Sequence, residues 1–410
     1  MRVGRRTRRI IAVLAALSPL LAASAVLPSQ PGKATDRAVR AAIGTPQVWA
    51  DRAAASYRSL QQNLYHGAAG HNLYRETTST SPGHNPYSYV WEFREASQAT
   101  LDLQNITGNE STYRSDIAAR FAALQQYVST NPARPGFNSY LPPPLGKGGD
   151  LYYDDNAEVG LSLLSAYHAN GDRSLIDRAR TAFAADVRGW DTAPGRICPG
   201  GVRWVEKSSD AERAANSTGF SAQLSVELYQ ITGQRAYLDW AKRAYQWNRT
   251  CLMQSAGLYW DSCRDDGTVN TALWSYNSGS MIGTAVQLYR TTGDRRFLNN
   301  AIADANGALA YWTKGDRLYN QPAIFNVYFF RDLLLLDSQH HDARYLATLQ
   351  YYAARLWVAN RNPTTGLFQF KAEQGGAPDP TLPVQTLNQS AVVQLFSLLA
   401  WDPTGYARIS

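Results

Sequence analysis

Two kinds of helix-length segment alternate along the chain, and they differ in where their apolar residues fall. In the first kind, apolar residues recur every three or four positions on one face, at 113–128, 176–187 and 298–312. In the second kind nearly every side chain is apolar or small, at 157–169, 220–231, 280–289, 323–336 and 390–400. The first pattern predicts helices with one face in water, and the second predicts helices that are covered on every side.

Short turns with a glycine join the two kinds of helix at regular intervals. Gly108, Gly171, Gly233 and Gly293 follow one another at spacings of 63, 62 and 60 residues. Glycine can adopt the left-handed conformation that ends a helix, and a neighbouring Asp or Asn can accept hydrogen bonds from the free amides of the next helix. Each turn therefore predicts an αα-hairpin, and the period predicts a repeat architecture.

The alternation predicts an all-α fold, an (α/α)6 toroid of about twelve helices in two concentric rings, over residues 45–410. An open solenoid of helical hairpins would show the same alternation, but solenoid repeats are usually shorter and more alike. The connections 188–213 and 253–274 are longer than a compact fold needs. We expect these loops to gather at one end of the toroid, where the buried helices begin.

The first 25 residues are typical of a signal peptide. Arg2, Arg5, Arg6, Arg8 and Arg9 precede an apolar run over 10–27, and the small residues at 23–25 offer a cleavage site. We expect a signal peptide over 1–25, a flexible segment over 26–44 and a secreted or extracytoplasmic protein. An uncleaved membrane anchor is the alternative, because the run approaches the length of a membrane span. Loss of the five arginines lowers the net charge from +7 to about +2, too little to indicate a nucleic-acid partner.

The cysteines and histidines do not form a metal-binding pattern. Cys198, Cys251 and Cys263 lie in or beside the long loops, so an exported protein would form one disulfide, with the pairing left open. The six histidines show no His-Glu-x-x-His spacing, and His340 and His341 lie at a helix start where solvation is the usual state. We expect neither a catalytic metal nor a cofactor.

An acidic pair stands at the start of one of the buried helices. Adjacent aspartates at such a position most often cap the helix and compensate its dipole. Asp154 and Asp155, however, follow two tyrosines and a Gly/Pro-rich loop at 142–149, and they open a helix of the inner ring. They should therefore face the mouth of the toroid. Two carboxyls in one aromatic cleft cannot both ionise freely, so the pair predicts an acid and a nucleophile.

Aromatic and amide side chains occur at the same end of the predicted toroid. Such a mouth suits a sugar chain, whose CH faces stack on aromatic rings while its hydroxyls bind amides. Trp91 and Asn320 are better explained as a core residue and a helix cap. The candidate substrate-binding residues are Tyr153, Trp204, Asn216, Asp266, Trp274, Tyr276, Asn277, Asn388 and Gln389.

These motifs resemble glycoside hydrolase family 76, the α-1,6-mannanase family, over nearly all of the mature chain. The resemblance rests on the segments 152–157, 200–204, 274–279 and 387–391. It implies an (α/α)6 barrel and retaining hydrolysis of α-1,6-mannosidic bonds, with Asp154 as nucleophile and Asp155 as acid/base. The sequence departs from the family pattern at Glu158 and Val159, where many relatives carry bulky apolar or aromatic residues.

Three functions are compatible with the sequence. The first is an exported, monomeric endo-α-1,6-mannanase acting on α-mannan. Retaining glycosidases hold their two carboxyls about 5–5.5 Å apart and inverting ones at least about 6.5 Å, so adjacent acids favour retention. The alternatives are an α-mannan transglycosidase that acts in cell-envelope remodelling and a non-catalytic glycan-binding toroid. An epimerase is disfavoured, because only His168 lies on a predicted inner helix.

Overall fold

The computed structural model describes residues 33–81, 85–207, 209–371 and 375–409. The expected signal peptide lies outside these ranges. Part of the segment that was expected to be flexible, 26–44, is helical: α1 (Lys33–Ala41) packs against α12 (Ala343–Ala359). The Tyr351 hydroxyl donates a hydrogen bond to Asp36 at 2.9 Å. For residues 33–41 the expectation of a flexible segment is therefore corrected.

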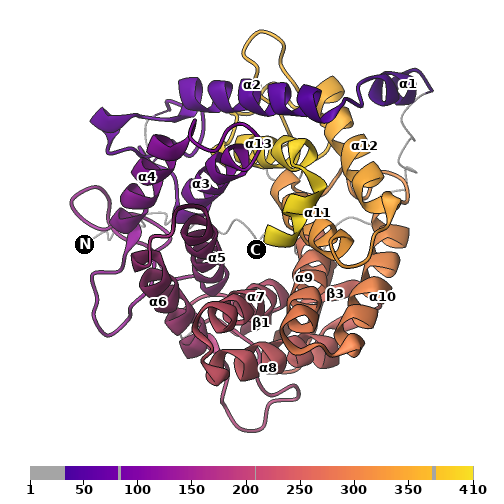
Figure 1. Cartoon of the computed structure of the whole chain (residues 1–410). Helices are drawn as coiled ribbons and strands as arrows, with labels where there is room; N and C mark the ends of the chain where they lie inside the picture. Colours follow the sequence, from indigo (N-terminus) through magenta and orange to yellow (C-terminus); the bar gives the residue numbers. More distant parts are fainter. Residues whose placement is uncertain (1–32, 82–84, 208, 372–374, 410) are drawn as a thin grey trace, which may run out of the picture.

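Six helices form a closed inner ring. They are α3 (Val90–Gln104), α5 (Tyr153–Asn170), α7 (Ala215–Thr232), α9 (Ser275–Thr292), α11 (Ala323–Asp337) and α13 (Thr386–Ala400). Each contacts the next, and α13 packs back against α3 (Figure 1). This contact closes the ring and excludes the open solenoid. The segments predicted to be covered on all sides all lie in these helices.

A second set of helices surrounds the inner ring (Figure 1). It consists of α2 (Pro46–Leu64), α4 (Arg114–Ala123), α6 (Ser174–Gly189), α8 (Arg235–Cys251), α10 (Arg295–Trp312) and α12. The inner helix α13 packs on the outer helix α2, so the first outer helix is covered by the last inner one. The (α/α)6 toroid is confirmed.

Glycine ends three of the inner helices, as the sequence predicted. Gly171, Gly233 and Gly293 have φ between 68° and 76°, and each donates its amide to the carbonyl four residues back. The side chain of Asp294 then accepts a hydrogen bond from the amide of Arg296. Gly108 differs, because α3 already ends at Gln104 and Gly108 lies within the following turn. These short turns lie at one end of the barrel.

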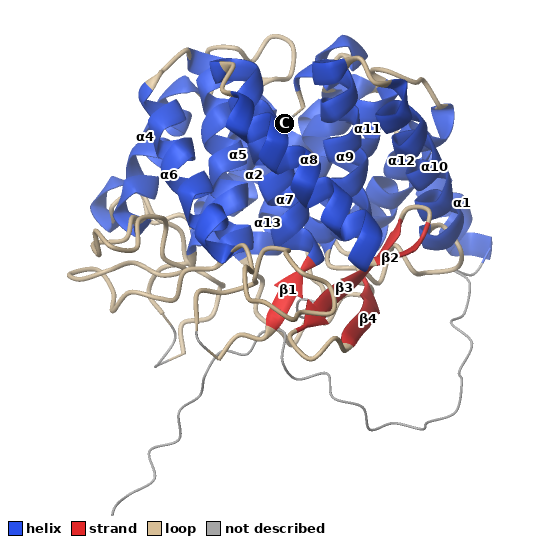
Figure 2. Ribbon diagram, turned by 90° about the horizontal axis from the view of Figure 1, so that it is seen from below, coloured by secondary structure: helices blue, strands red, loops and turns tan. Residues whose placement is uncertain are grey.

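The opposite end, which we call the mouth, is where the inner helices begin and where the longer connections gather (Figure 2). Part of these connections is a small antiparallel sheet that the sequence analysis did not predict. Its strands are β1 (Glu212–Ala214), β2 (Met253–Ser255), β3 (Leu258–Arg264) and β4 (Val269–Leu273), and β3 pairs with each of the other three. The connection 253–274, expected to be a loop, is thus mostly strand.

The end of the chain covers the other side of the barrel. After α13, the 3-10 helix η4 (Pro403–Arg408) packs against α11, at the end with the short turns (Figures 1 and 2). Trp401 donates its indole N–H to the carbonyl of Asp102 at 2.8 Å, and Tyr406 and Ile409 are buried. This segment explains why the polar interior of the barrel is shielded from solvent on that side.

The axis of the inner ring is polar rather than apolar. Arg331 binds Asp102 at 2.6 Å, Gln223 donates to Asp332 at 2.8 Å, and Gln287 donates to Glu227 at 2.9 Å. Buried charges of this kind are tolerated when each has a partner. Among the described residues, no helix combines the length and the hydropathy that crossing a bilayer requires.

A disulfide fixes one loop of the mouth. Cys198, in the connection between α6 and β1, is bonded to Cys251 at the end of α8. Cys263 on β3 is buried and unpaired, and Arg213 donates to its sulfur at 3.2 Å. The structure therefore assigns the pairing that the sequence left open.

The ion pair on the barrel axis gives a stability prediction. Replacing Arg331 by Ala leaves Asp102 buried without its counterion, and burial already raises the pKa of Asp102. We expect the free energy of unfolding to fall by about 3–5 kcal/mol in urea denaturation. Arg235, whose side chain is 69% exposed and paired with Asp239, is the matched control, and Arg235→Ala should cost less than about 1 kcal/mol. Equal losses in the two variants would contradict the prediction.

Candidate active site

The structure brings Asp154 and Asp155 to the mouth, in the first turn of α5. One oxygen of Asp154, Oδ1, accepts a hydrogen bond from the backbone amide of Asp155 at 2.9 Å. The other, Oδ2, accepts from Trp204 Nε1 at 3.0 Å and from Asn216 Nδ2 at 2.7 Å. Three donors therefore converge on one carboxylate, and each of them stabilises its charged form.

Both carboxyls are only partly exposed. They nevertheless differ in how readily they ionise, because their neighbours differ. Burial raises the pKa of Asp154 to about 6, while its hydrogen bonds oppose this shift. Burial also raises the pKa of Asp155, and the negative charge of Asp154 raises it further, to well above the usual range. Asp154 therefore ionises first, and Asp155 keeps its proton to higher pH than Asp154 does. The pair thus offers one nucleophile and one acid.

The loop that carries Trp204 is held rigidly. Gly200 and Gly201 have φ of 99° and 84°, and a Cβ on Gly201 would come within 2.5 Å of the Trp247 indole. Only glycine fits both the conformation and the space. The carbonyl of Trp204 accepts from the Tyr153 amide at 2.9 Å, and its own amide donates to Asp210 at 3.1 Å. These contacts aim the indole at Asp154.

An aromatic wall forms another side of the mouth. The ring of Tyr276, at the start of α9, stacks on Phe325 of α11, with ring centres 4.0 Å apart and planes 8° apart. Trp274 meets the same Phe325 edge to face at 5.6 Å, and Trp91 lies at 6.3 Å. Burial raises the pKa of Tyr276, and the nearby charges of Asp261 and Asp154 raise it further. This wall is therefore close to the acidic pair.

Asp261 on β3 is a third carboxyl of the site, and sequence reasoning missed it. The side chains of Trp274 and Asn277 face its carboxyl, and their N–H groups have no other partner among the described residues. Burial raises the pKa of Asp261 to about 7, with smaller contributions from Glu212 and Asp154. The one sequence signal was an aromatic-rich run between Gly257 and Gly267, which is typical of a strand.

Tyr153 does not line the site, which corrects the prediction. Its ring is buried against Gly189 at the end of α6, where an added Cβ would come within 2.9 Å of the ring. The preceding residue, Tyr152, takes the predicted place: its ring meets Trp204 edge to face at 5.0 Å. Neighbouring side chains at the start of α5 point in different directions, so Tyr152 faces the mouth and Tyr153 does not.

Two further candidates have structural roles instead. Asp266 is exposed and accepts hydrogen bonds from the amide and the hydroxyl of Thr268, so it shapes the turn between β3 and β4. Gln389 uses its amide to bind both backbone groups of Phe368, at 3.0 and 2.8 Å. Asn388, in the first turn of α13, donates to Gln385 at 2.8 Å and remains a candidate of the mouth.

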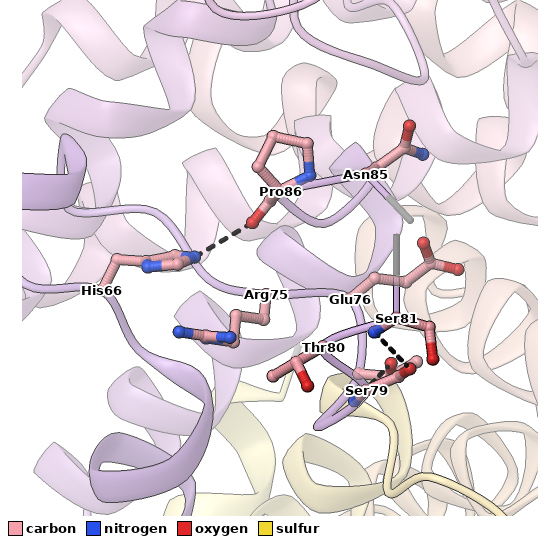
Figure 3. A pocket seen from close by; sticks show the side chains of 9 residues that line it. His66, Arg75, Glu76, Ser79, Thr80, Ser81, Asn85 and Pro86 are labelled. Carbon is pink, nitrogen blue, oxygen red and sulfur yellow. Dashed lines mark hydrogen bonds between the residues drawn. The ribbon is translucent and has the colours of Figure 1, made fainter. Parts of the chain in front are cut away.

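A separate polar pocket of about 240 Å³ lies in the connection between α2 and α3 (Figure 3). His66 Nε2 lies 3.0 Å from the carbonyl oxygen of Pro86, and Arg75 and Asn85 complete part of its lining. Neither aspartate of the pair lines this pocket. The acidic pair, with its three donors and aromatic wall, is therefore the candidate active site.

Across the described residues, no group of three or more His, Cys, Asp or Glu side chains is arranged to hold a metal ion.

The family model for glycosyl hydrolase family 76 matches residues 49–396. The chain belongs to this family. The matched range includes both aspartates, Trp204, Asn216 and Asp261, and it ends within α13. The family assignment made from the sequence motifs is confirmed.

Among curated family 76 relatives, a mannan endo-1,6-alpha-mannosidase of Saccharomyces cerevisiae is 27% identical over 249 residues. That match covers 55% of this chain and 52% of the yeast protein. The chain spans about half the length of the curated relatives it matches. The likeness to the yeast protein therefore covers about half of each of the two chains.

Solved family 76 structures share the fold. A mannosidase of Bacteroides thetaiotaomicron superimposes with a TM-score of 0.75 at 23% identity, covering 86% of this chain and 98% of that one. An α-1,6-mannanase of Salegentibacter superimposes with a TM-score of 0.70 at 20% identity, covering 86% and 99%. The latter is described as an inactive variant, with two adjacent aspartates replaced by asparagine, in complex with α-1,6-mannotriose.

The donors on Asp154 give a prediction that requires no substrate. Asn216→Ala removes the shortest of them, so the anion loses stabilisation and the pKa of Asp154 should rise above about 6. A hydrogen bond to a charged group contributes about 1.5–3 kcal/mol, which corresponds to about one to two pH units. Carbon-13 NMR of labelled aspartate carboxyls measures this pKa. Gln389→Ala, on the first turn of α13 where its amide binds the backbone of Phe368, should leave it unchanged, and a shift in that variant as well would refute the assignment.

Proposed function

We propose that the chain is a retaining endo-α-1,6-mannosidase that hydrolyses α-mannan. The observation that carries the proposal is the pair itself: Asp154 accepts three hydrogen bonds, beside an Asp155 whose pKa is raised well above its usual range by burial and by the charge of Asp154. The relatives are mannan endo-1,6-alpha-mannosidases and α-1,6-mannanases, which supports the choice of substrate.

In the first step, an Asp154 oxygen attacks the anomeric carbon while Asp155 donates its proton to the departing glycosidic oxygen. The bond between the carbon and that oxygen breaks, and a glycosyl ester forms on Asp154. Attack needs an ionised Asp154, which its pKa of about 6 provides at neutral pH. Trp204 and Asn216 share Oδ2, which leaves Oδ1, bonded only to a backbone amide, as the less encumbered oxygen.

In the second step, a water molecule attacks the same anomeric carbon and the ester bond to Asp154 breaks. Asp155, now ionised, takes the proton of that water and returns to its starting state. The negative charge on Asp154 disappears when the ester forms, which relieves the repulsion that raised the pKa of Asp155. Asp155 therefore becomes easier to deprotonate in the step that requires it as a base.

Around this pair, the aromatic wall and Asp261 bind the sugar. The half-buried Trp274 suits the CH surface of a mannose ring, and the carboxyl of Asp261 suits neighbouring hydroxyls. Asp261 and Trp274 are therefore proposed as substrate-binding residues. Tyr276 is 5% exposed and Asn277 is fully buried, so these two support the aromatic wall and Asp261 from behind. With the ring closed within one chain, the site is complete without a second copy, so we propose a monomer.

We also propose that the enzyme acts outside the cytoplasm. The arginine-rich N-terminus followed by an apolar run supports export. The disulfide between Cys198 and Cys251 supports an oxidising compartment.

Asp154→Asn provides the direct test of the reaction. The amide cannot form the glycosyl ester, so hydrolysis of linear α-1,6-mannan should fall by at least about 10³-fold, while the circular-dichroism spectrum stays that of the wild type. Proton NMR of the wild-type reaction should show the α-anomer of the product first, because two displacements restore the configuration. The matched control is Asp266→Asn, in an exposed turn, and its activity should be unchanged.

Other outcomes distinguish the alternatives. Initial release of the β-anomer would refute retention. Products longer than the supplied oligosaccharide would favour a transglycosidase, and binding of mannan without turnover would favour a glycan-binding toroid.

Asp261 gives a separate prediction about substrate recognition. Asp261→Ala should lower kcat/KM on α-1,6-mannan by about 10²-fold, because the sugar loses the hydrogen bonds of a largely buried carboxyl. Steady-state kinetics on oligosaccharides of defined length measures the loss, with Asp266→Ala as control. An unchanged kcat/KM in Asp261→Ala would remove this residue from the site.

A further inference from the structure

A buried carboxyl that the two displacement steps do not use lies directly below the acidic pair. Glu158 follows Asp155 by three residues and Asp154 by four on α5, so the three side chains share one face of the helix. Its side chain is buried, with only 3% of the residue exposed. Its Oε2 atom has no hydrogen-bond partner among the described residues. An unpartnered buried carboxylate oxygen is costly unless it serves some purpose.

The nearest buried cation does not neutralise Glu158. Arg94 of α3 directs Nη1 to Glu95 at 2.5 Å and to the Tyr328 hydroxyl at 3.0 Å. Its Nε donates to the backbone carbonyl of Glu158 at 3.0 Å, not to the carboxyl. The other oxygen of Glu95 accepts from Gln394 at 2.7 Å. Arg94 therefore forms its ion pair with Glu95.

The titratable groups around Glu158 and the acidic pair come from five elements. Asp154 and Asp155 lie on α5 itself, Glu92, Arg94 and Glu95 on α3, Tyr328 on α11, Tyr276 on α9, and Asp261 on β3. Carboxyls outnumber the single guanidinium, so some of them must stay protonated. Three hydrogen-bond donors converge on Asp154, and Arg94, Tyr328 and Gln394 donate hydrogen bonds to Glu95. Asp155 and Glu158 have no comparable set of donors.

We propose that Glu158 is a positioning residue for the acid/base: Asp155 and Glu158 retain one proton between them, and the charge left on Glu158 holds that proton on Asp155. This inference rests on the proposed function. Burial raises the pKa of both carboxyls, but at Glu158 the charge of Arg94 and the hydroxyl of Tyr328 oppose this shift, whereas every neighbouring charge at Asp155 adds to it. The proton therefore resides on Asp155, facing the leaving oxygen, and the charge resides on Glu158, facing Arg94.

The arrangement has a consequence for both displacement steps. A fixed negative charge one helical turn away keeps Asp155 protonated at pH values where an isolated aspartate would be ionised. When Asp155 gives its proton to the leaving oxygen, Asp155 and Glu158 are both ionised, while Asp154 is held in the ester. Asp155 is then a stronger base toward the incoming water than it would be without Glu158.

Glu158→Gln tests the inference, because it keeps the shape of the side chain and removes the charge. Loss of a like charge lowers the pKa of Asp155, so the basic limb of the kcat/KM profile against pH should move to lower pH by about one to two units. Glu158→Asp keeps a carboxyl and should retain a limb near that of the wild type. If Glu158 served only for packing, Glu158→Gln would lower kcat/KM at all pH values and leave the basic limb of the profile at the same pH.

Glu227→Gln is the matched control. Glu227 is also a buried carboxyl on an inner helix, but it lies near the far end of α7, hydrogen bonded to Gln287. Burial raises its pKa to about 8, so the same chemical change is made in a similar environment. Its pH profile should match that of the wild type.

A second measurement separates this inference from the proposed function. Carbon-13 NMR of labelled aspartate carboxyls reports the pKa of Asp155 without any substrate, and it should fall by the same one to two units in Glu158→Gln. If the wild type is inactive, the proposed function is overturned, but the titration still tests whether Glu158 raises the pKa of Asp155. A pKa of Asp155 that stays constant or rises in Glu158→Gln, or an equal shift in Glu227→Gln, would overturn the inference.

Discussion

Closure of the inner ring is the constraint on which the rest of this structure depends. Helices such as α11, which are apolar almost all round, cannot be stable with one side in water, so each needs an inner neighbour on both flanks. The contact between α13 and α3 supplies the last of these neighbours. Because every inner helix runs in the same direction, closure also brings all six amino ends to one mouth.

That convergence creates the electrostatic environment of the site. Helix starts carry free amides and a partial positive charge, which favours carboxylates, whereas burial in the same place disfavours them. At Asp154 the donors prevail, since Trp204 and Asn216 arrive from two other parts of the chain. At Asp155 burial prevails. One dipeptide therefore contains two carboxyls of different character, set by their neighbours.

The polar interior of the barrel is part of the same arrangement. Arg94 and Arg331 both form ion pairs with carboxylates inside the ring, and the C-terminal segment covers the end away from the mouth. Glu158 lies between this interior and the site, with no cation of its own. A carboxyl in that position links the charge balance of the barrel to the protonation of Asp155.

The sequence alone determined the architecture and the acidic pair. The glycine spacing and the contrast between one-sided and all-round apolar helices are periodic signals that can be recognised locally. A helix that is apolar on all sides must be buried, so other helices of the chain must cover it. The motifs at 152–157 and 200–204 likewise identified the family and the catalytic candidates. The identity of the disulfide, by contrast, depends on which loops meet, and three cysteines in sequence do not reveal that.

Tertiary structure alone decided which side chains surround the pair. The ring of Tyr153 packs against Gly189, whereas the ring of Tyr152 contacts Trp204, because of where α5 meets the loop that carries Trp204. The amide of Gln389 is hydrogen-bonded to the backbone of Phe368. Asp261 reaches the mouth on a strand that pairs with segments up to about 50 residues away in sequence. The periodicity of the sequence determines which face of a helix is buried. The hydrogen-bond donors that a polar side chain meets on that face come from distant segments of the chain, and only the folded ring brings the side chain and its donors together.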